Sequence, residues 1–334
     1  MTKSRIAILT GGYSAEANIS VKSAKTVLHH IDSNLFETYL IVISKEKWVH
    51  IDANQHEFSI DKNDFSLTLN QQKINFDLVF FALHGTPAED GKIQGYFDML
   101  GLKYCGSNMM EMALSFDKAA TKKYLKSVNV LMAESNLYYK QESIFDIVMH
   151  ISLHMKMPVF VKPNKNGSSY GITKVNEIKE LEASIINGFK YDNELIVEAF
   201  ISGREMTCGV YQFDDTITAL APTEIKSQND FFDYKAKYLG ESEEVTPAEI
   251  SPELTKKIQE ISIHIFRELG LKSHARIDFI MHEDEFYFLE ANTIPGLTDE
   301  SLIPQQVAHA GWVLKDFFTA IIQEGFRKYD VAPI

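Results

Sequence analysis

The stretch Ala275-Arg-Ile-Asp-Phe-Ile-Met-His-Glu-Asp-Glu-Phe-Tyr-Phe-Leu-Glu-Ala-Asn292 predicts two β-strands joined by a short acidic turn. Polar and apolar residues alternate in its first half, as in a half-buried strand, and its second half is rich in aromatic residues, which favour a pleated surface. A loop with an odd number of residues centred on Asp284 would bring Asp278 opposite Glu290 and Arg276 opposite Asn292. An even loop would break that register.

Two carboxylates directly opposite each other repel, so Asp278 and Glu290 need a counter-charge. Together with Asn292 they offer oxygen ligands, which suit a hard cation such as magnesium, and magnesium also bridges to phosphate oxygens. The alternative is a solvated acidic hairpin edge. The turn that follows, Thr293-Ile-Pro-Gly-Leu-Thr298, favours the cation site, because Gly296 can bring backbone N–H groups close to an anion.

Three segments together resemble the metal and substrate signature of the D-alanine:D-alanine ligases, which belong to the ATP-grasp superfamily: Arg276-Ile-Asp278, Leu289-Glu-Ala-Asn-Thr-Ile-Pro-Gly296 and Ser301-Leu302. The resemblance extends over about residues 5 to 325. Ala291 stands where that family usually has Val or Ile, and Asp299-Glu300 stand in place of a Ser or Pro-type linker. Neither departure falls on a ligand position.

The resemblance implies a combined α/β and α+β fold. Residues 1–106 would form a doubly wound α/β substrate domain, and an ATP-grasp fold of two α+β subdomains would follow, with the nucleotide between them. Residues 107–199 would carry the phosphate flap, and residues 200–334 the metal site and a mobile loop.

The activity implied by the resemblance is ATP-dependent ligation of two D-alanines through an acyl phosphate. ADP and phosphate would be released, and the dipeptide would serve peptidoglycan precursor synthesis. Magnesium or manganese, as two ions, would be held by Asp278, Glu290 and Asn292. Arg276 and the Gly296 amide would stabilise the developing oxyanion. Ser301 and Leu302 would bind the carboxylate of the second D-alanine at a helix start.

The composition of the chain excludes several classes of protein. The chain has 334 residues, of which 45% are hydrophobic and 24% charged, as expected for a globular protein of two or three units. A net charge of -13 argues against a nucleic-acid partner. Two cysteines give no disulfide framework, and Cys105 has no nucleophile motif around it. Without a signal-type segment or an apolar run of about 20 residues, we expect a cytoplasmic protein with no membrane partner, and we expect a homodimer.

The N-terminal region predicts an α/β unit. An apolar run, Ile6–Leu9, leads through a glycine turn into a helix, but the turn lacks the glycine spacing of a dinucleotide site. Further strands are expected at Tyr39–Ile43 and Leu78–Leu83, and a helix at Ile93–Leu100.

Two residues at the ends of these strands gain roles from the resemblance. Glu16 would grip the ammonium of the first D-alanine, and His84 would lie near the same substrate. The alternatives are a helix-dipole partner for Glu16 and a fully hydrogen-bonded structural histidine for His84. Tyr13 is larger than the residue that the family usually has there.

The middle of the chain carries predicted nucleotide contacts. Helical patterns cover residues 107–127, with a break at Asp117-Lys118, and residues 135–157; strands are expected at Pro158–Lys162 and Gly171–Val175. Between those strands, Pro163-Asn-Lys-Asn-Gly-Ser-Ser-Tyr170 is either a simple hairpin tip or a flap that closes over polyphosphate. By resemblance Lys118 and Lys162 bind phosphates and Ser168 contacts substrate. Tyr170 replaces a small aliphatic residue of the family.

The C-terminal part completes the expected site. A strand is expected at Glu194–Ile201. By resemblance to the family, Glu198 would border the adenine and Glu205 would hold the ribose hydroxyls; the alternative for both is a solvated strand-end carboxylate. Residues 224–246 are polar apart from an aromatic cluster, which suggests a lid that packs only over substrate. By resemblance Lys237 binds phosphate there, and Tyr238 closes the site and favours a peptide product. Helices are expected at Pro252–Leu269 and Trp312–Glu324.

Three other functions stay open at this level. A D-alanyl-D-lactate ligase would share the phosphate residues and differ in its second substrate. A nucleotide-binding regulatory protein would bind ATP without ligating. An NAD-binding oxidoreductase would need the dinucleotide glycine spacing that the first strand lacks.

Overall fold

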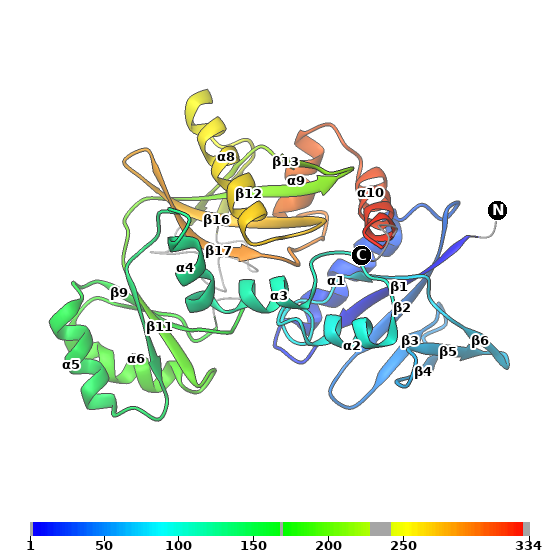
Figure 1. Ribbon diagram of the computed structural model, residues 1–334, viewed down its shortest axis with the longest axis horizontal. Helices are drawn as coiled ribbons and strands as arrows, with labels where there is room; N and C mark the ends of the chain where they lie inside the picture. The colour runs from blue at the N-terminus through cyan, green and yellow to red at the C-terminus, as the bar shows by residue number, and fades with distance from the viewer. Residues whose placement is uncertain (1–2, 168–169, 228–241, 330–334) are drawn as a thin grey trace.

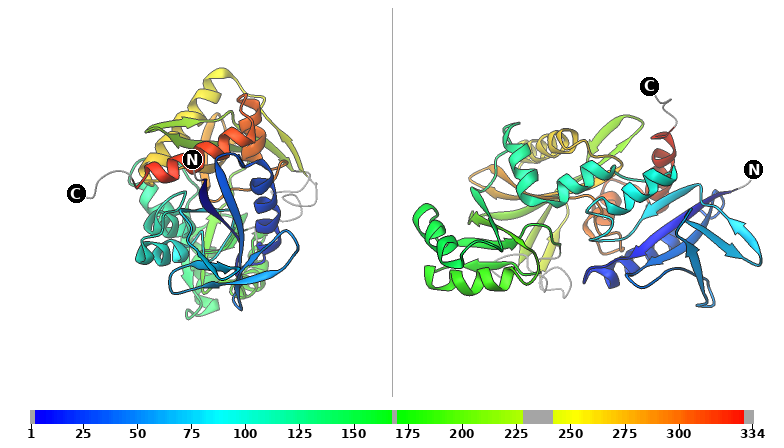
Figure 2. Two further views of the ribbon diagram at one scale, coloured as in Figure 1. Left: turned by 90° about the vertical axis from the view of Figure 1, so that its right-hand side faces the viewer. Right: turned by 60° about the horizontal axis from the view of Figure 1, so that its bottom comes forward.

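The computed structural model describes residues 3–167, 170–227 and 242–329, and its strands form sheets of seven, four and six strands. Figure 1 places the N-terminal sheet at the right, the four-stranded sheet and its helices at the lower left, and the six-stranded sheet above them. Helices α3 and α4 run between these parts in both Figure 1 and the right panel of Figure 2. Within the described ranges, no helix combines the length and apolar character that crossing a membrane requires.

The N-terminal sheet has the strand order β6-β5-β4-β3-β2-β1-β7. Strand β1 pairs in parallel with β2 and with β7, as expected for an α/β unit, whereas β3 to β6 extend the sheet as an antiparallel meander that the sequence patterns did not predict. The bounds are β1 (Ser4–Gly11), β2 (Phe36–Ile43), β3 (Trp48–Ile51), β4 (Glu57–Asp61), β5 (Ser66–Leu69), β6 (Gln72–Ile74) and β7 (Leu78–Phe81).

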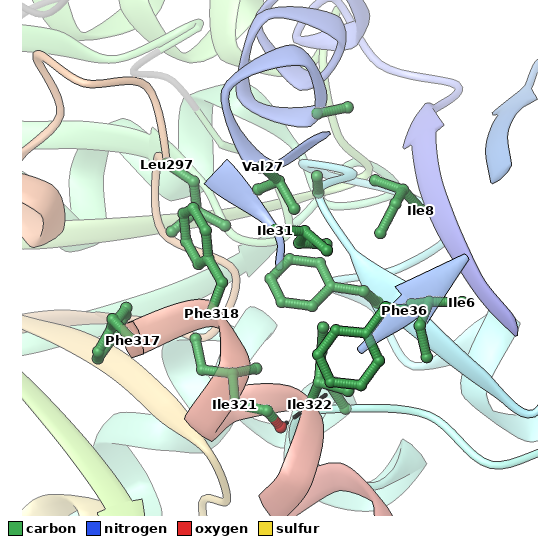
Figure 3. Packing of buried hydrophobic residues seen from close by; sticks show 14 of the residues in the cluster. Ile6, Ile8, Val27, Ile31, Phe36, Leu297, Phe317, Phe318, Ile321 and Ile322 are labelled. Carbon is green, nitrogen blue, oxygen red and sulfur yellow. Dashed lines mark hydrogen bonds between the residues drawn. The ribbon is translucent and has the colours of Figure 1, made fainter. Parts of the chain in front are cut away.

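Helices cover both faces of this sheet, so the predicted doubly wound arrangement is confirmed. Side chains alternate along β1: Ile6 and Ile8 pack against α1 (Ala17–His30) and α10 (Leu314–Arg327), while Ala7 and Leu9 face the cluster that contains residues of α2 (Lys92–Leu100). Figure 3 shows Phe318 of the C-terminal helix beside Leu297, in the same cluster as Ile6 and Phe36. The C-terminal helix therefore belongs to the N-terminal core.

The four-stranded sheet is antiparallel, in the order β10-β9-β11-β8. Its strands and covering helices are β8 (Ser135–Tyr139), β9 (Val159–Pro163), β10 (Thr173–Val175), β11 (Glu194–Ala199), α5 (Ile144–His154) and α6 (Leu181–Gly188). The expectation of a continuous helical connection over residues 135–157 is wrong at its start. Residues 135–139 form an edge strand because the backbone pairs with β11, and this pairing outweighs local preference.

The predicted helix break at Asp117-Lys118 is confirmed. Helix α3 (Met109–Phe116) ends there, and α4 (Lys118–Lys126) begins at once. The Asp117 carboxylate accepts a 2.9 Å hydrogen bond from the backbone N–H of Ala120, which caps α4. This sharp junction fixes the position of Lys118 at the first turn of α4.

The six-stranded sheet is antiparallel and carries the stretch with which the sequence analysis began. Its strand path is β15-β14-β12-β16-β17, with β13 paired to β12, and α8 packs against it. The bounds are β12 (Arg204–Phe213), β13 (Thr216–Ala219), β14 (Thr223–Ser227), β15 (Ser242–Val245), β16 (His274–His282), β17 (Glu285–Asn292) and α8 (Pro252–Glu268).

Asp278 lies opposite Glu290 and Arg276 opposite Asn292, as predicted, but not for the predicted reason. The turn is even: His282 pairs with Glu285, and the two residues between them, Glu283 and Asp284, have positive φ angles of 48° and 61°. A register shift between Asp278 and Phe279 then inserts one extra residue into β17. The loop is therefore the even one, and the bulge restores the pairing that an even loop alone would break.

The expected polar loop over residues 224–246 is partly a hairpin. Its described ends form β14 and β15, which pair from Glu224–Val245 to Ser227–Ser242. Beyond the ribbon, a further helix, α9 (Leu302–His309), begins directly after Ser301. Leu297 from the turn before it joins the N-terminal core, as Figure 3 shows. The loop after the acidic ribbon is thus anchored in a different part of the fold from the ribbon itself.

Candidate active site

Asp278 accepts four side-chain hydrogen bonds at the predicted site. Its Oδ1 accepts from Arg276 Nε at 2.9 Å and from Thr207 Oγ1 at 2.6 Å, and its Oδ2 accepts from Arg276 at 2.8 Å and from Asn292 Nδ2 at 2.8 Å. Strand pairing explains the cluster, because Thr207 on β12 and Glu290 on β17 are the direct neighbours of Asp278. The carboxylate is buried, so these four bonds compensate for its lost hydration.

Glu290 lies across from Asp278 on the neighbouring strand, β17. Its carboxylate is 3.8 Å from the Nζ of Lys118, which also donates a 2.7 Å hydrogen bond to the backbone oxygen of Asn166. Lys118 thus connects the acidic ribbon to the segment predicted to be a flap. Among the described residues, no three His, Cys, Asp or Glu side chains form a metal-binding group.

The oxygen donors of Asp278, Glu290 and Asn292 nevertheless fit a hard cation. The two carboxylates face each other, and the chain already supplies positive charge to each, from Arg276 and from Lys118. A divalent ion here would replace protein cations as the counter-charge. Asn292 turns its amide nitrogen toward Asp278, and rotation of the amide would present its oxygen instead.

A second charge cluster lies where β9, β11 and α4 meet. Lys162 Nζ donates to Glu198 Oε2 at 2.5 Å, and the other oxygen of Glu198 is paired with Lys122. All three side chains are mostly or fully buried. Although desolvation raises the pKa of Glu198, the two lysines lower it to about 2, so the group stays ionised. The Glu198 carboxylate therefore holds the predicted phosphate lysine.

Glu16 is approached by two glycines from different parts of the chain. A Cβ atom on Gly85 would lie 3.1 Å from Glu16 Oε2, and one on Gly167 would lie 2.7 Å from the same oxygen. A side chain at either glycine would require the Glu16 carboxylate or the glycine's own segment to shift. The N-terminal turn, the end of the strand β7 region and the predicted flap therefore converge on the Glu16 carboxylate.

His84 has both ring nitrogens engaged within the protein. Nδ1 is 2.9 Å from the backbone oxygen of Ile294 and therefore donates, so Nε2 accepts from the Ser23 hydroxyl at 3.1 Å. Desolvation lowers the pKa of His84, consistent with a neutral ring. Leu297 N–H in turn donates to Ser23 at 3.4 Å. His84 thus fastens the turn around Gly296 to the N-terminal domain.

The predicted site for the second substrate lies at the start of α9. Ser301 is the residue before the first helical turn, and its hydroxyl is 2.7 Å from Thr298 Oγ1 and accepts from the Thr298 N–H at 3.1 Å. A Cβ on Gly296 would come within 2.8 Å of Ser301 Oγ. Gly296 and Ser301 therefore lie close together, directly before the first helical residue, Leu302.

Three of the predicted residues, Ser168, Lys237 and Tyr238, lie outside the described residues. Glu205 is on β12, paired with Ile225 of β14, and its charge acts on Lys162, whose pKa is raised overall by its acidic neighbours against the effect of burial. The ligand roles given to all of these residues stay predictions.

Comparison with known proteins identifies the family. Residues 5–107 match the family model of the D-ala D-ala ligase N-terminus, and residues 125–323 match that of the D-ala D-ala ligase C-terminus. A D-alanine:D-alanine ligase of Flavobacterium johnsoniae is 47% identical over 320 residues, which is 95% of this chain and 98% of that relative. The chain belongs to the D-alanine:D-alanine ligase family.

Solved structures of D-alanine:D-alanine ligase relatives have the same fold. The VanG D-Ala:D-Ser ligase of Enterococcus faecalis superposes with a TM-score of 0.87 at 30% identity, covering 97% of this chain and 100% of that one. A D-alanine:D-alanine ligase of Bacillus anthracis complexed with ATP gives a TM-score of 0.77 at 25% identity and covers 99% and 100% of the two chains. The predicted ATP-grasp fold and the assignment to a ligase family are confirmed.

The sequence analysis did not predict three residues that lie at the candidate site of this member of the D-alanine:D-alanine ligase family. Lys122 lies one helical turn after Lys118 on α4, a spacing that signals a shared face. Thr207 lies between Met206 and Cys208 on β12 and gave no local signal. Glu89, five residues after His84, interacts electrostatically with Glu16, Glu290 and Lys118. The position of Glu89 shortly after the end of a strand is the sequence signal that could have identified it.

Proposed function

We propose that this chain joins two molecules of D-alanine into D-alanyl-D-alanine, with conversion of ATP to ADP and phosphate, and that the dipeptide enters peptidoglycan synthesis. The observation that carries the proposal is the facing pair Asp278 and Glu290, each next to a cationic side chain, in a chain whose two halves match this ligase family. Such an arrangement suits a reaction in which phosphate charge must be neutralised and transferred.

The nucleotide would lie between the four-stranded and six-stranded sheets. Lys118 and Lys162 would bind its phosphates, together with Lys237; Glu198 would border the adenine, and Glu205 would hold the ribose. The proximity of Lys118 to Asn166 supports this arrangement, since it links a phosphate lysine to the flap segment. Closure of that segment would exclude water from the reacting groups.

Magnesium or manganese, as two ions, would be held by Asp278, Glu290 and Asn292. A divalent cation supplies electrostatic stabilisation of the transferring phosphoryl group. The contribution of the chain itself is to fix the carboxylates opposite each other and to keep Arg276 beside them. Arg276 and the Gly296 amide would then stabilise negative charge that develops on the carbonyl oxygen.

The two amino acids would occupy the region between Glu16 and Ser301. Glu16 would bind the ammonium of the first D-alanine, and Ser168 and Tyr238 would complete its enclosure. The carboxylate of this D-alanine attacks the terminal phosphorus of ATP, ADP leaves, and an acyl phosphate forms. The amine of the second D-alanine, whose carboxylate would rest on Ser301 and Leu302, attacks the acyl carbon and expels phosphate. Positioning supplies most of the rate.

We further propose a division into domains of residues 1–106, 107–199 and 200–334, a homodimer, and a cytoplasmic location. The three separate sheets support the division, although α10 of the last range packs against the N-terminal sheet. Two buried cysteines without a disulfide suit a reducing compartment. Size-exclusion chromatography with light scattering tests the dimer directly.

The decisive experiment incubates the purified chain with ATP, magnesium and D-alanine, and measures ADP, phosphate and dipeptide together. Equal amounts of the three products are expected, with none from L-alanine. ATP binding without D-alanine-dependent phosphate release would instead indicate a regulatory nucleotide-binding protein and overturn the proposal.

The second substrate is tested in the same assay. The curated relative at 47% identity is a D-alanine:D-alanine ligase, whereas the D-Ala:D-Ser ligase structure is 30% identical, and this difference favours D-alanine. Offering D-alanine, D-serine and D-lactate in competition across a pH series should give D-alanyl-D-alanine as the main product. A predominant ester or D-serine product would correct the assignment.

A further inference from the structure

Lys122 is a buried cation to which the proposed reaction assigns no role. It lies on α4 and is 3% exposed, and it forms an ion pair with Glu198 Oε1. Glu198 is 2% exposed and uses its other oxygen for Lys162. One buried carboxylate is thus shared by two lysines from different elements, α4 and β9.

This sharing matters because the partners of Glu198 have different tasks. A buried ionised carboxylate that loses its partner is costly, since neither water nor another charge compensates for it. If Glu198 had Lys162 alone, moving the Lys162 ammonium toward a phosphate would leave the carboxylate unpaired. With Lys122 on the other oxygen, the Lys162 ammonium can turn away at a much smaller cost.

We infer that Lys122 is a positioning residue that keeps Glu198 neutralised, so that Lys162 is released from Glu198 to bind nucleotide phosphate. The inference rests on the proposed function only in requiring that Lys162 binds phosphate. Lys122 itself touches neither nucleotide nor amino acid. It acts through Glu198.

The other charges around this cluster are consistent with this division of roles. Lys162 is also attracted by Glu205 on β12 and Glu290 on β17, and both lie on the six-stranded sheet. For Lys122, burial lowers the pKa, the Glu198 carboxylate opposes that shift, and the charges of Lys162 and Lys118 add to it. Lys162 therefore has acidic neighbours toward the proposed nucleotide site, whereas Glu198 is the acid that binds Lys122.

The test measures the Kd for a non-hydrolysable ATP analogue, with an imido bridge between its β and γ phosphates, in the presence of magnesium. Isothermal titration calorimetry is carried out on the whole chain without D-alanine. Lys122→Met removes the charge and keeps most of the side-chain length. Lys123→Met, at an exposed position of the same helix, is the matched control. We expect Lys122→Met to raise the Kd for nucleotide by about tenfold or more, and Lys123→Met to leave it unchanged.

A proton count separates this role from a purely structural one. In Lys122→Met, Glu198 loses Lys162 when nucleotide binds, so its pKa rises and it takes up a proton. Nucleotide binding to this variant should therefore take up more protons than binding to the parent, measured in buffers of different ionisation enthalpy. Its affinity deficit should shrink as the pH falls. In the parent chain, Lys122 keeps Glu198 ionised and this extra uptake is absent.

A double-mutant cycle completes the test if Lys122→Met folds poorly. In a Glu198→Gln background there is no carboxylate to neutralise, so adding Lys122→Met should change the nucleotide Kd by less than about threefold. An equal loss with and without the Glu198 charge overturns the inference, as does a Lys122→Met variant with the parent Kd and proton uptake. A parent chain that fails to bind the analogue at all would instead refute the proposed function.

Discussion

Both carboxylate oxygens of Asp278 are held by the guanidinium of Arg276, its neighbour two residues earlier on the same face of β16, at 2.9 Å and 2.8 Å. Thr207 and Asn292 donate to the same two oxygens. A carboxylate has about four lone-pair positions, so all of them are used. A cation that binds Asp278 must displace at least one of these donors.

We therefore predict that Mn²⁺ binds weakly to the chain alone and at least about tenfold more tightly when ADP is present. Phosphate oxygens would add ligands to the cation and would attract Lys118 away from Glu290. Electron paramagnetic resonance of free Mn²⁺ measures both affinities, after subtraction of Mn²⁺ bound by ADP in solution. Equal affinity with and without ADP would contradict the competition that this geometry implies.

Asp278→Asn and Glu290→Gln should each lower the rate of dipeptide formation by about two orders of magnitude or more, because each removes a charge from the phosphate-facing ribbon. The amides have nearly the shape of the acids, so the fold should survive. Glu283→Gln, in the exposed turn of the same ribbon, is the matched control and should keep full activity. Near-normal ligation by both variants, measured as ADP and dipeptide, would refute the metal assignment.

The pairing of β16 with β17 shows which features of the fold can be predicted from the sequence. Period-two alternation reveals which side chains share a face, so the meeting of Asp278 and Glu290 was predictable. The two-residue turn and the bulge that compensates for it were not, because they change the register in opposite directions and leave the pairing unchanged. Only the three-dimensional structure distinguishes a single odd loop from an even turn followed by a bulge.

Other elements were missed because tertiary contacts decide them. Strands β3 to β6 are three to five residues long and contain many polar residues. Such short segments do not show a clear alternation of polar and apolar residues, so the sequence does not predict them as strands. Residues 135–139 become a strand through pairing with β11. The link from Lys122 to Glu198 joins residues far apart in sequence, and a single sequence without an alignment carries no signal of that contact.

His84→Ala should destabilise the chain by about 2–4 kcal/mol, because it leaves the Ile294 carbonyl and the Ser23 hydroxyl without their buried partner and opens a cavity. It should also raise the KM for D-alanine, since the turn around Gly296 loses its attachment to the N-terminal core. His84→Asn, which keeps a donor near the Nδ1 position, should lose less. Urea unfolding and steady-state kinetics measure the two effects. Unchanged stability in His84→Ala would show that this link is dispensable.

Gly167→Ala should raise the KM for D-alanine by about tenfold without lowering stability. The added Cβ would lie 2.7 Å from Glu16 Oε2, closer than such atoms approach, so the carboxylate or the flap must shift. Gly95→Ala in α2 is the control, because its Cβ would meet only the flexible side chain of Met109. A normal KM in Gly167→Ala would indicate that Glu16 and this segment separate during turnover.

The environment of Glu89 predicts how the stability of the folded chain depends on pH. Burial, and then the negative charge of Glu16, raises the pKa of Glu89 well above its ordinary value of 4.5. A carboxyl whose pKa is higher in the folded chain binds more protons there than in the unfolded chain, so its contribution to stability falls as the pH rises above about 4.5. The neutral Glu89→Gln should therefore be more stable than the parent at pH 8, with a midpoint about 2–4 °C higher.

The advantage of Glu89→Gln should disappear when both chains are compared near pH 4.5, because the parent carboxyl is then protonated in the folded state. Thermal unfolding at a series of pH values, without ligands, measures the difference. Glu142→Gln, at an exposed position on the four-stranded sheet side, should show no such trend. A Glu89→Gln chain that is less stable than the parent at pH 8 would mean that Lys118 outweighs burial and Glu16, and that Glu89 is ionised in the folded protein.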